Sequence, residues 1–193
     1  MEDYSKNKRC RHNSDNNSHH SEKHDKKCED TGSKIKKHEK KGKLVDFDYK
    51  NLSPIANPNL DDIPIISPLT TQTPFSIAAV TLHNVEKGNV VWLNALYHVD
   101  NDTASGSVRT ADIVTAIYKN SIAESNLIWR SIVEIDAPEG DDVSQIVAQF
   151  VDKITATEPN VTYILTAQLG PQTPSAVAGV AGPITFTASE IAF

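Results

Sequence analysis

The feature that most constrains the fold of this chain is an abrupt change of composition near Lys43. Residues 1–43 contain 13 Lys and Arg against 8 Asp and Glu, a net charge of +5 (13 − 8). The remaining residues contain 6 Lys and Arg against 17 Asp and Glu, a net charge of −11, and the two parts sum to −6. The first part has scarcely any apolar side chains and cannot offset the entropy of ordering. We therefore predict that residues 1–43 form a disordered, charged arm rich in Lys and His.

The next segment, residues 44–74, is expected to form an extended connector. Alternating apolar and polar residues at its start predict a strand with Val45, Phe47 and Tyr49 on one face. Five prolines exclude a helix and favour an extended path: Pro54, Pro58, Pro64, Pro68 and Pro74. Such a segment could add a strand to the sheet edge of a neighbouring subunit, where main-chain hydrogen bonds supply the affinity. The residues expected to dock are Val45, Phe47, Tyr49, Ile63, Ile65 and Ile66.

From residue 75 to residue 193 the pattern is that of an all-β domain. Alternating segments of strand length follow one another, separated by turn sequences such as Glu86-Lys87-Gly88-Asn89. About eight strands at this spacing predict an antiparallel jelly-roll sandwich. Residues 143–154 fit a helical stripe as well as a strand. We interpret them as a strand with Ile146, Ala148 and Phe150 inward, because they lie among regularly spaced strands.

Several strands are apolar on both faces, most clearly residues 90–99 and 109–118. One face of each sheet in a two-layer sandwich is expected to contact water. Burial on both sides therefore suggests a second covering surface, and a neighbouring subunit is the simplest one. The chain also ends on an apolar strand, Ile191-Ala192-Phe193, which points in the same direction. We predict a homo-oligomer.

Residues that could carry chemistry are few. His19, His20, His24 and Cys28 could gather a soft divalent ion, but the paired-cysteine spacing of structural zinc sites is absent, so no metal site is predicted. Both cysteines, Cys10 and Cys28, lie in the arm, where they could form cross-links between chains or stay reduced.

Catalytic residues are not predicted either. His83 and His98 stand alone, without a local motif that would place a nucleophile beside them. The acidic pairs Asp61-Asp62, Asp100/Asp102 and Asp141-Asp142 read as solvated loop tips, although loop acids could also hold calcium. Trp92 and Trp129 could form a sugar-stacking platform, but they are expected to lie inward, in the core. We predict no cofactor and no enzymatic activity.

Composition also limits the partners. The acidic domain argues against binding of nucleic acid, which needs clustered Lys and Arg. No stretch approaches the ~20 apolar residues of a membrane span. Nothing at the start of the sequence resembles a secretory signal, so synthesis in a cytosol is expected.

Late segments of the chain, Thr162-Tyr163-Ile164-Leu165-Thr166-Ala167 and Gly182-Pro183-Ile184-Thr185-Phe186-Thr187-Ala188, look like late strands of one protein group. With the charged leader, the Pro-rich connector and the ending on a strand, the pattern over residues 60–193 resembles bacterial spore-surface proteins with a TNF-like jelly-roll domain. That group includes exosporium and endospore-appendage subunits. The Lys- and His-rich leader has no residue-by-residue counterpart in the group.

The resemblance implies a homotrimer on a spore surface, made in the mother-cell cytosol, with the arm attached to a neighbouring subunit or an underlying layer. Other spore-surface proteins are the expected partners. The hypothesis is a non-enzymatic structural subunit that assembles with itself. A ligand- or glycan-binding sandwich, using loops 100–107 and 137–142, is the alternative from a different class. An enzyme on a cupin-type jelly roll would need clustered metal ligands, and the domain offers only His83 and His98.

Overall fold

The computed structural model of the chain describes residues 41–52, 65–101, 110–136, 143–172 and 176–193. All of them belong to one compact unit, Glu39–Phe193. Nearly all of the predicted arm and much of the connector, with Ile63, lie outside these residues. The strands are β1 (Lys43–Leu52), β2 (Ile65–Pro68), β3 (Phe75–Val85), β4 (Val90–Asn101), β5 (Thr110–Lys119), β6 (Leu127–Asp136), β7 (Val143–Lys153), β8 (Glu158–Leu169) and β9 (Ala178–Ala192), with one short 3-10 helix, η1 (Glu124–Asn126).

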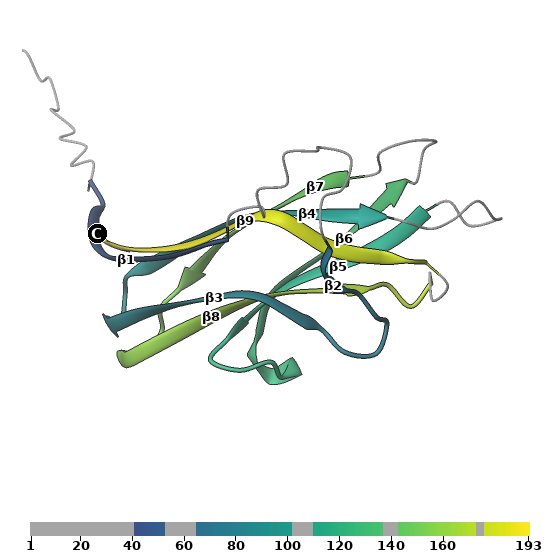
Figure 1. Cartoon of the computed structure of the whole chain (residues 1–193). Helices are drawn as coiled ribbons and strands as arrows, with labels where there is room; N and C mark the ends of the chain where they lie inside the picture. Colours follow the sequence, from purple (N-terminus) through teal and green to yellow (C-terminus); the bar gives the residue numbers. More distant parts are fainter. Residues whose placement is uncertain (1–40, 53–64, 102–109, 137–142, 173–175) are drawn as a thin grey trace, which may run out of the picture. The chain divides into compact units, whose positions relative to one another are not determined.

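The strands form two antiparallel sheets that pack face to face (Figure 1). Sheet A has the order β1-β9-β4-β7, with β2 also paired to β9, and sheet B has the order β3-β8-β5-β6. Chain neighbours such as β3 and β4 lie in different sheets, so the chain crosses between layers, as in a jelly roll. The predicted antiparallel sandwich is therefore confirmed.

The core lies between the sheets because one face of each strand is continuously apolar. In β4 every second residue from Val91 to Val99 is fully buried, and β8 repeats the pattern from Val161 to Leu169. Packing of these faces supplies the main stabilising free energy. Polar contacts also cross between the sheets: the Tyr97 hydroxyl of sheet A lies 2.5 Å from the Thr115 hydroxyl of sheet B.

The ambiguous segment at residues 143–154 is a strand, as expected. Ile146 and Ala148 are buried in β7, and Phe150 packs against the core. The turn between β3 and β4 also forms where the sequence predicts it. Gly88 has φ +95°, a conformation that other residues rarely adopt, and the Asn89 N–H donates to the Glu86 carbonyl at 3.2 Å.

The described parts of the connector lie in sheet A. β1 pairs along its length with β9, and a bulge at Val45 shifts the register between Leu44 and Asp46. β2 pairs with another part of β9 (Figure 1). Among the described residues there is no helix long and apolar enough to cross a membrane.

Candidate assembly surface

The outer face of sheet A carries a block of side chains that contains no Asp, Glu, Lys, Arg or His. The registers between its strands align three successive rows across β1, β9, β4 and β7. We call this block the uncharged face. Its twelve residues are Phe47, Tyr49 and Asn51 in β1, Thr185, Thr187 and Ser189 in β9, Trp92, Asn94 and Leu96 in β4, and Val147, Gln149 and Val151 in β7.

The large side chains of the uncharged face are open to solvent. The exposed fractions are 49% for Phe47, 62% for Tyr49, 51% for Trp92, 54% for Val147 and 49% for Val151. Lys153 and His98 lie just beyond the two ends of the block. In a domain whose sequence carries many acids, this area without charge marks a candidate contact surface.

Short contacts hold the side chains of this face in place. The Phe47 and Tyr49 rings stack with centroids 5.9 Å apart and an interplanar angle of 24°. Gln149 Nε2 donates to Asn94 Oδ1 at 3.2 Å, and the Thr185 hydroxyl donates to Asn51 Oδ1 at 3.1 Å. The face is therefore held by its own contacts before any partner binds, which lowers the ordering cost of binding.

Trp92 corrects one expectation. The sequence predicted an inward, core position, but Trp92 points outward, because its neighbours Val91 and Leu93 face the core. The alternation of the sequence could have predicted this orientation. Trp92 shares its strand face with the polar residues Asn94 and His98, whereas the other face of residues 91–99 carries aliphatic residues and Tyr97. Trp129 is partly buried and packs against the core, as expected.

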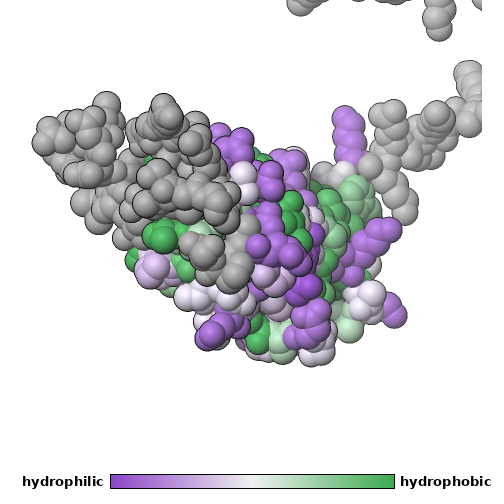
Figure 2. Space-filling view, turned by 90° about the vertical axis from the view of Figure 1, so that its right-hand side faces the viewer, coloured by the Kyte–Doolittle hydropathy of each residue, from purple (hydrophilic) through white to green (hydrophobic). Residues whose placement is uncertain are grey.

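The two strands singled out for burial on both faces behave differently. Val114, Ala116 and Tyr118 on the outer side of β5 are buried within the single chain. The outer side of β4 is not covered in this way, as Trp92 shows. The side of the domain seen in Figure 2 mixes hydrophobic residues (green) with hydrophilic ones (purple). The case for a covering partner therefore rests on sheet A.

The opposite side of β1 carries two acids that join the sheets. Asp46 Oδ2 accepts the His83 N–H at 2.8 Å, and Asp48 Oδ2 accepts the Thr81 N–H at 2.6 Å. The other oxygen of each carboxylate accepts the N–H of the following residue, at 2.8 Å in both cases. We call these contacts the carboxylate bridges. They satisfy main-chain donors on two strand edges that would otherwise be open.

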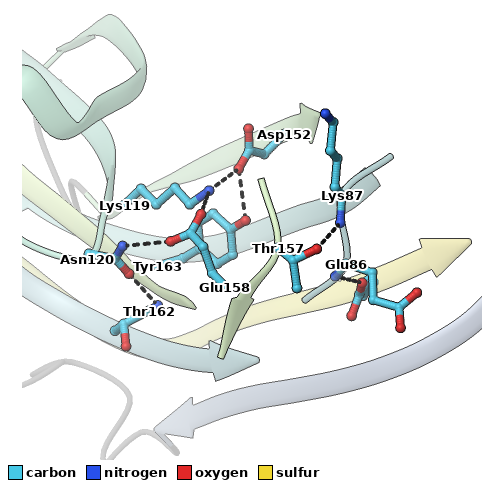
Figure 3. Close-up of polar contacts among 10 residues, drawn as sticks. Glu86, Lys87, Lys119, Asn120, Asp152, Thr157, Glu158, Thr162 and Tyr163 are labelled. Atoms are coloured by element: carbon cyan, nitrogen blue, oxygen red, sulfur yellow. Dashed lines mark hydrogen bonds and ion pairs between the residues drawn. The ribbon is translucent and has the colours of Figure 1, made fainter. Parts of the chain in front are cut away.

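A polar cluster lies where β5, β7 and β8 meet (Figure 3). Lys119 Nζ lies 2.7 Å from Glu158 Oε1 and 3.7 Å from Asp152 Oδ2, and the Tyr163 hydroxyl donates to Asp152 at 2.9 Å. The hydrogen bond from Lys119 lowers the pKa of Glu158. Burial, followed by the charge of Asp152, raises the pKa of Tyr163 well above its ordinary value. All four groups have partners, which is typical of a structural link between sheets.

Buried Glu190 forms a second polar contact near the β3–β4 turn. Glu190 Oε1 accepts Asn89 Nδ2 at 2.6 Å and the Glu86 N–H at 3.0 Å, whereas Oε2 has no hydrogen-bond partner. These bonds attach the turn to β9, and Lys87 N–H adds a bond to the Thr157 hydroxyl (Figure 3). Among the described residues, no group of three or more His, Cys, Asp or Glu could hold a metal ion.

The predicted docking residues are only partly described. Val45, Phe47 and Tyr49 are exposed on β1, and Ile66 is exposed on β2, which also contains Ile65. Cys10, Cys28 and Ile63 lie outside the described residues, as do Asp61-Asp62, Asp102 and Asp141-Asp142. Docking of these residues on a neighbour stays a prediction.

The two histidines of the domain lie in different sheets. His83 Nδ1 lies 2.6 Å from Asn160 Oδ1 on β8, and His98 Nδ1 lies 3.2 Å from the Pro183 carbonyl on β9. The contacts they make are therefore with an amide oxygen and a main-chain oxygen. Neither contact is that of a nucleophile–base pair.

Comparisons with known proteins add little to this geometry. No family model matches the sequence, and no curated protein matches it. Among solved structures, the chain is similar to the dimeric latent form of PorU from Porphyromonas gingivalis, with a TM-score of 0.34 and 9% sequence identity. The match covers 76% of this chain and 13% of that chain, so this chain spans only a small part of PorU.

Proposed function

We propose that this protein is a non-enzymatic structural subunit that assembles with itself on a spore surface or appendage. The observation that carries the proposal is the uncharged face of sheet A. Water-exposed aromatic and aliphatic side chains gain free energy when another surface covers them. The face bears no charge, so two acidic domains can meet there without placing like charges opposite each other.

The size of the face indicates the strength of such a contact. Aromatic residues bury about 150–250 Å² each, so half-exposed Phe47, Tyr49 and Trp92 offer about 300 Å² together. The whole block, with strands about 4.8 Å apart and about 6.8 Å between rows, covers roughly 400 Å². Two such faces in contact bury less than the about 1,200 Å² of a standard interface. One contact of this kind is weak, and an assembly needs several per subunit.

The location and the trimeric state are supported by the resemblance to spore-surface jelly-roll proteins. In that reading the arm before β1 attaches to a neighbouring subunit or to an underlying layer of other spore-surface proteins. Cys10 and Cys28 in the arm are the candidate cross-linking residues.

The test is the oligomeric state of the full chain, measured by sedimentation equilibrium from micromolar to millimolar concentration. We expect the wild type to form oligomers and Trp92→Lys to shift association to at least tenfold higher concentration. The matched control is Ile132→Lys, because Ile132 is also an exposed strand residue but lies on β6 in sheet B. A monomeric wild type at every concentration contradicts the proposal, and equal association of both variants shows that the contact does not use the uncharged face.

A second function, glycan binding, is favoured by the exposure of Trp92 next to Asn94 and Gln149. A sugar ring can stack on an indole while amide groups bind its hydroxyls. The candidate glycan site on sheet A is therefore formed by these three residues. The loops expected from the sequence, 100–107 and 137–142, lie mostly outside the described residues. A glycan array separates the two functions: binding that Trp92→Ala abolishes and Ile132→Ala preserves supports the glycan site.

A further inference from the structure

The position of β1 has the properties of a peptide-binding site that is filled by the chain itself. On one side β9 offers a main-chain ladder over the whole of Lys43–Leu52. On the other side β3 offers the N–H groups of Thr81 and His83, two residues apart. An incoming strand satisfies both sides only if it is extended and carries carboxylates at positions i and i+2.

β1 itself is attached mainly by polar bonds. None of its ten residues is fully buried, and only Leu52 packs against the hydrophobic core. Its outward side chains, Phe47 and Tyr49, belong to the uncharged face and are 49% and 62% exposed. Among its side chains, only Leu52 therefore has to give up contacts with the hydrophobic core when the strand leaves the site.

We infer that this site binds β1 of a second copy of the chain, so that neighbouring subunits exchange this strand. A second copy supplies the required Asp46-Phe47-Asp48 pattern by identity. Its arm, with a net charge of +5, directly precedes β1 and is attracted to the −11 remainder of another chain.

The segment between β1 and β2 sets the reach of this exchange. Residues 53–64 separate β1 from β2, and twelve residues in extended form span at most about 40 Å. Reciprocal exchange gives a closed dimer, and passing each strand to the next copy gives a ring or a fibre. The inference deepens the proposed assembly function, because it adds a route that does not use the uncharged face.

The register provides a specific test. The Phe47 N–H binds the Asp46 side chain, so it points away from β9, and Phe47 and Ser189 form a non-hydrogen-bonded pair. Such pairs have Cα atoms about 4.5 Å apart, close enough for a disulfide. One full-length chain carries Phe47→Cys and another carries Ser189→Cys, both with Cys10→Ser and Cys28→Ser. After mixing and mild oxidation, strand exchange gives a disulfide-linked heterodimer on a non-reducing gel.

Two controls separate exchange from face-to-face contact. Phe47→Cys is also mixed with Trp92→Cys, which lies on the far side of β9 and is about two strand spacings from Phe47, too distant for a disulfide in an exchanged sheet. The Phe47→Cys and Ser189→Cys mixture is repeated with Trp92→Lys in both chains. Exchange predicts no disulfide in the first control and an undiminished disulfide in the second.

The carboxylate bridges give a kinetic readout. Asp46→Asn and Asp48→Asn, made together in both chains, weaken the carboxylate bridges that hold each β1 in its own domain. The rate of heterodimer formation should therefore rise by about tenfold or more. The inference is overturned if no heterodimer forms while a single chain with both cysteines closes its own disulfide. It is also overturned if Phe47→Cys links equally well to Trp92→Cys, a result that supports face contact and leaves the proposed function intact.

Discussion

The Asp48 carboxylate accepts the backbone N–H of Thr81 at 2.6 Å, although Asp48 lies in sheet A and Thr81 in sheet B. The Asp46 carboxylate repeats the contact with His83 at 2.8 Å. Acids that point inward on an edge strand are known to prevent unwanted strand pairing. Here they also satisfy the donors of the neighbouring edge, so one side of the sandwich is joined by side chains and not by a main-chain ladder.

Removing one bridge should therefore destabilise the domain measurably. Asp48→Ala leaves the N–H groups of Thr81 and Tyr49 without this acceptor. Hydrogen bonds to charged groups contribute about 1.5–3 kcal/mol, and partial exposure reduces this, so we expect a loss of about 1–2 kcal/mol. Urea unfolding of the variant and the wild type measures this loss in the free energy of unfolding. The control is Asp136→Ala, an exposed acid at the end of β6, which should change stability by less than about 0.5 kcal/mol.

The core contact between Tyr97 and Thr115 should show strong coupling in a double-mutant cycle. Each single substitution, Tyr97→Phe or Thr115→Val, leaves the remaining hydroxyl buried without this partner, at a cost of about 1–3 kcal/mol. The double variant removes both hydroxyls and should cost less than the sum of the two. Additive losses of unfolding free energy would show that the two hydroxyls act independently.

Much of the fold could be predicted from alternation alone. The pattern in residues 161–169 identified a strand, because Val161, Tyr163 and Leu165 all face the core of β8. Residues 143–154 contain the predicted strand, β7, despite a helical alternative, since the neighbouring strands fix the spacing of the sandwich. Local hydrophobic periodicity is sufficient for residues 161–169, whereas residues 143–154 also require the spacing of the neighbouring strands.

The candidate site was harder to predict, because it depends on pairing between strands distant in sequence. The uncharged face exists only because Phe47, Ser189 and Trp92 align across β1, β9 and β4. No local pattern reveals that register. In the same way, alternation puts Asp46 and Asp48 on the strand face opposite Phe47, but it does not reveal that the edge of β3 supplies their main-chain partners.

Stability at acid pH should depend on Glu158. The hydrogen bond from Lys119 lowers the pKa of Glu158 in the folded state from its ordinary 4.5. Because the pKa of Glu158 is lower in the folded state than in the unfolded state, its carboxylate stabilises the fold above about pH 4.5. This stabilisation is lost as the pH falls through the folded pKa. We expect Glu158→Gln to reduce the loss of melting temperature between pH 6 and pH 3. Lys119→Met should have the same effect, and an unchanged slope in both variants would contradict this role.

Stability at alkaline pH should depend on the buried tyrosines. Burial raises the pKa of Tyr97 and Tyr163 well above 10, and the charge of Asp152 adds to this for Tyr163. Above about pH 10 these tyrosines release protons in the unfolded chain but keep them in the folded chain. Their contribution to stability is therefore fully present below pH 10 and is lost as the pH rises. Absorbance at 295 nm should therefore report ionisation of both residues only upon unfolding. Tyr163→Phe should reduce the fall of unfolding free energy between pH 9 and pH 11.

Trp92 should report directly on whether a partner covers the uncharged face. The chain has two tryptophans, so Trp129→Phe leaves Trp92 as the only one, and Trp92→Phe leaves Trp129. At low concentration Trp92, with 51% of its surface exposed, should be quenched by acrylamide more strongly than partly buried Trp129. As the concentration rises and the face is covered, quenching of Trp92 should fall at least twofold while that of Trp129 stays constant. Equal changes at both tryptophans would indicate a general change of the fold, and no change at Trp92 in an oligomer would place the contact elsewhere.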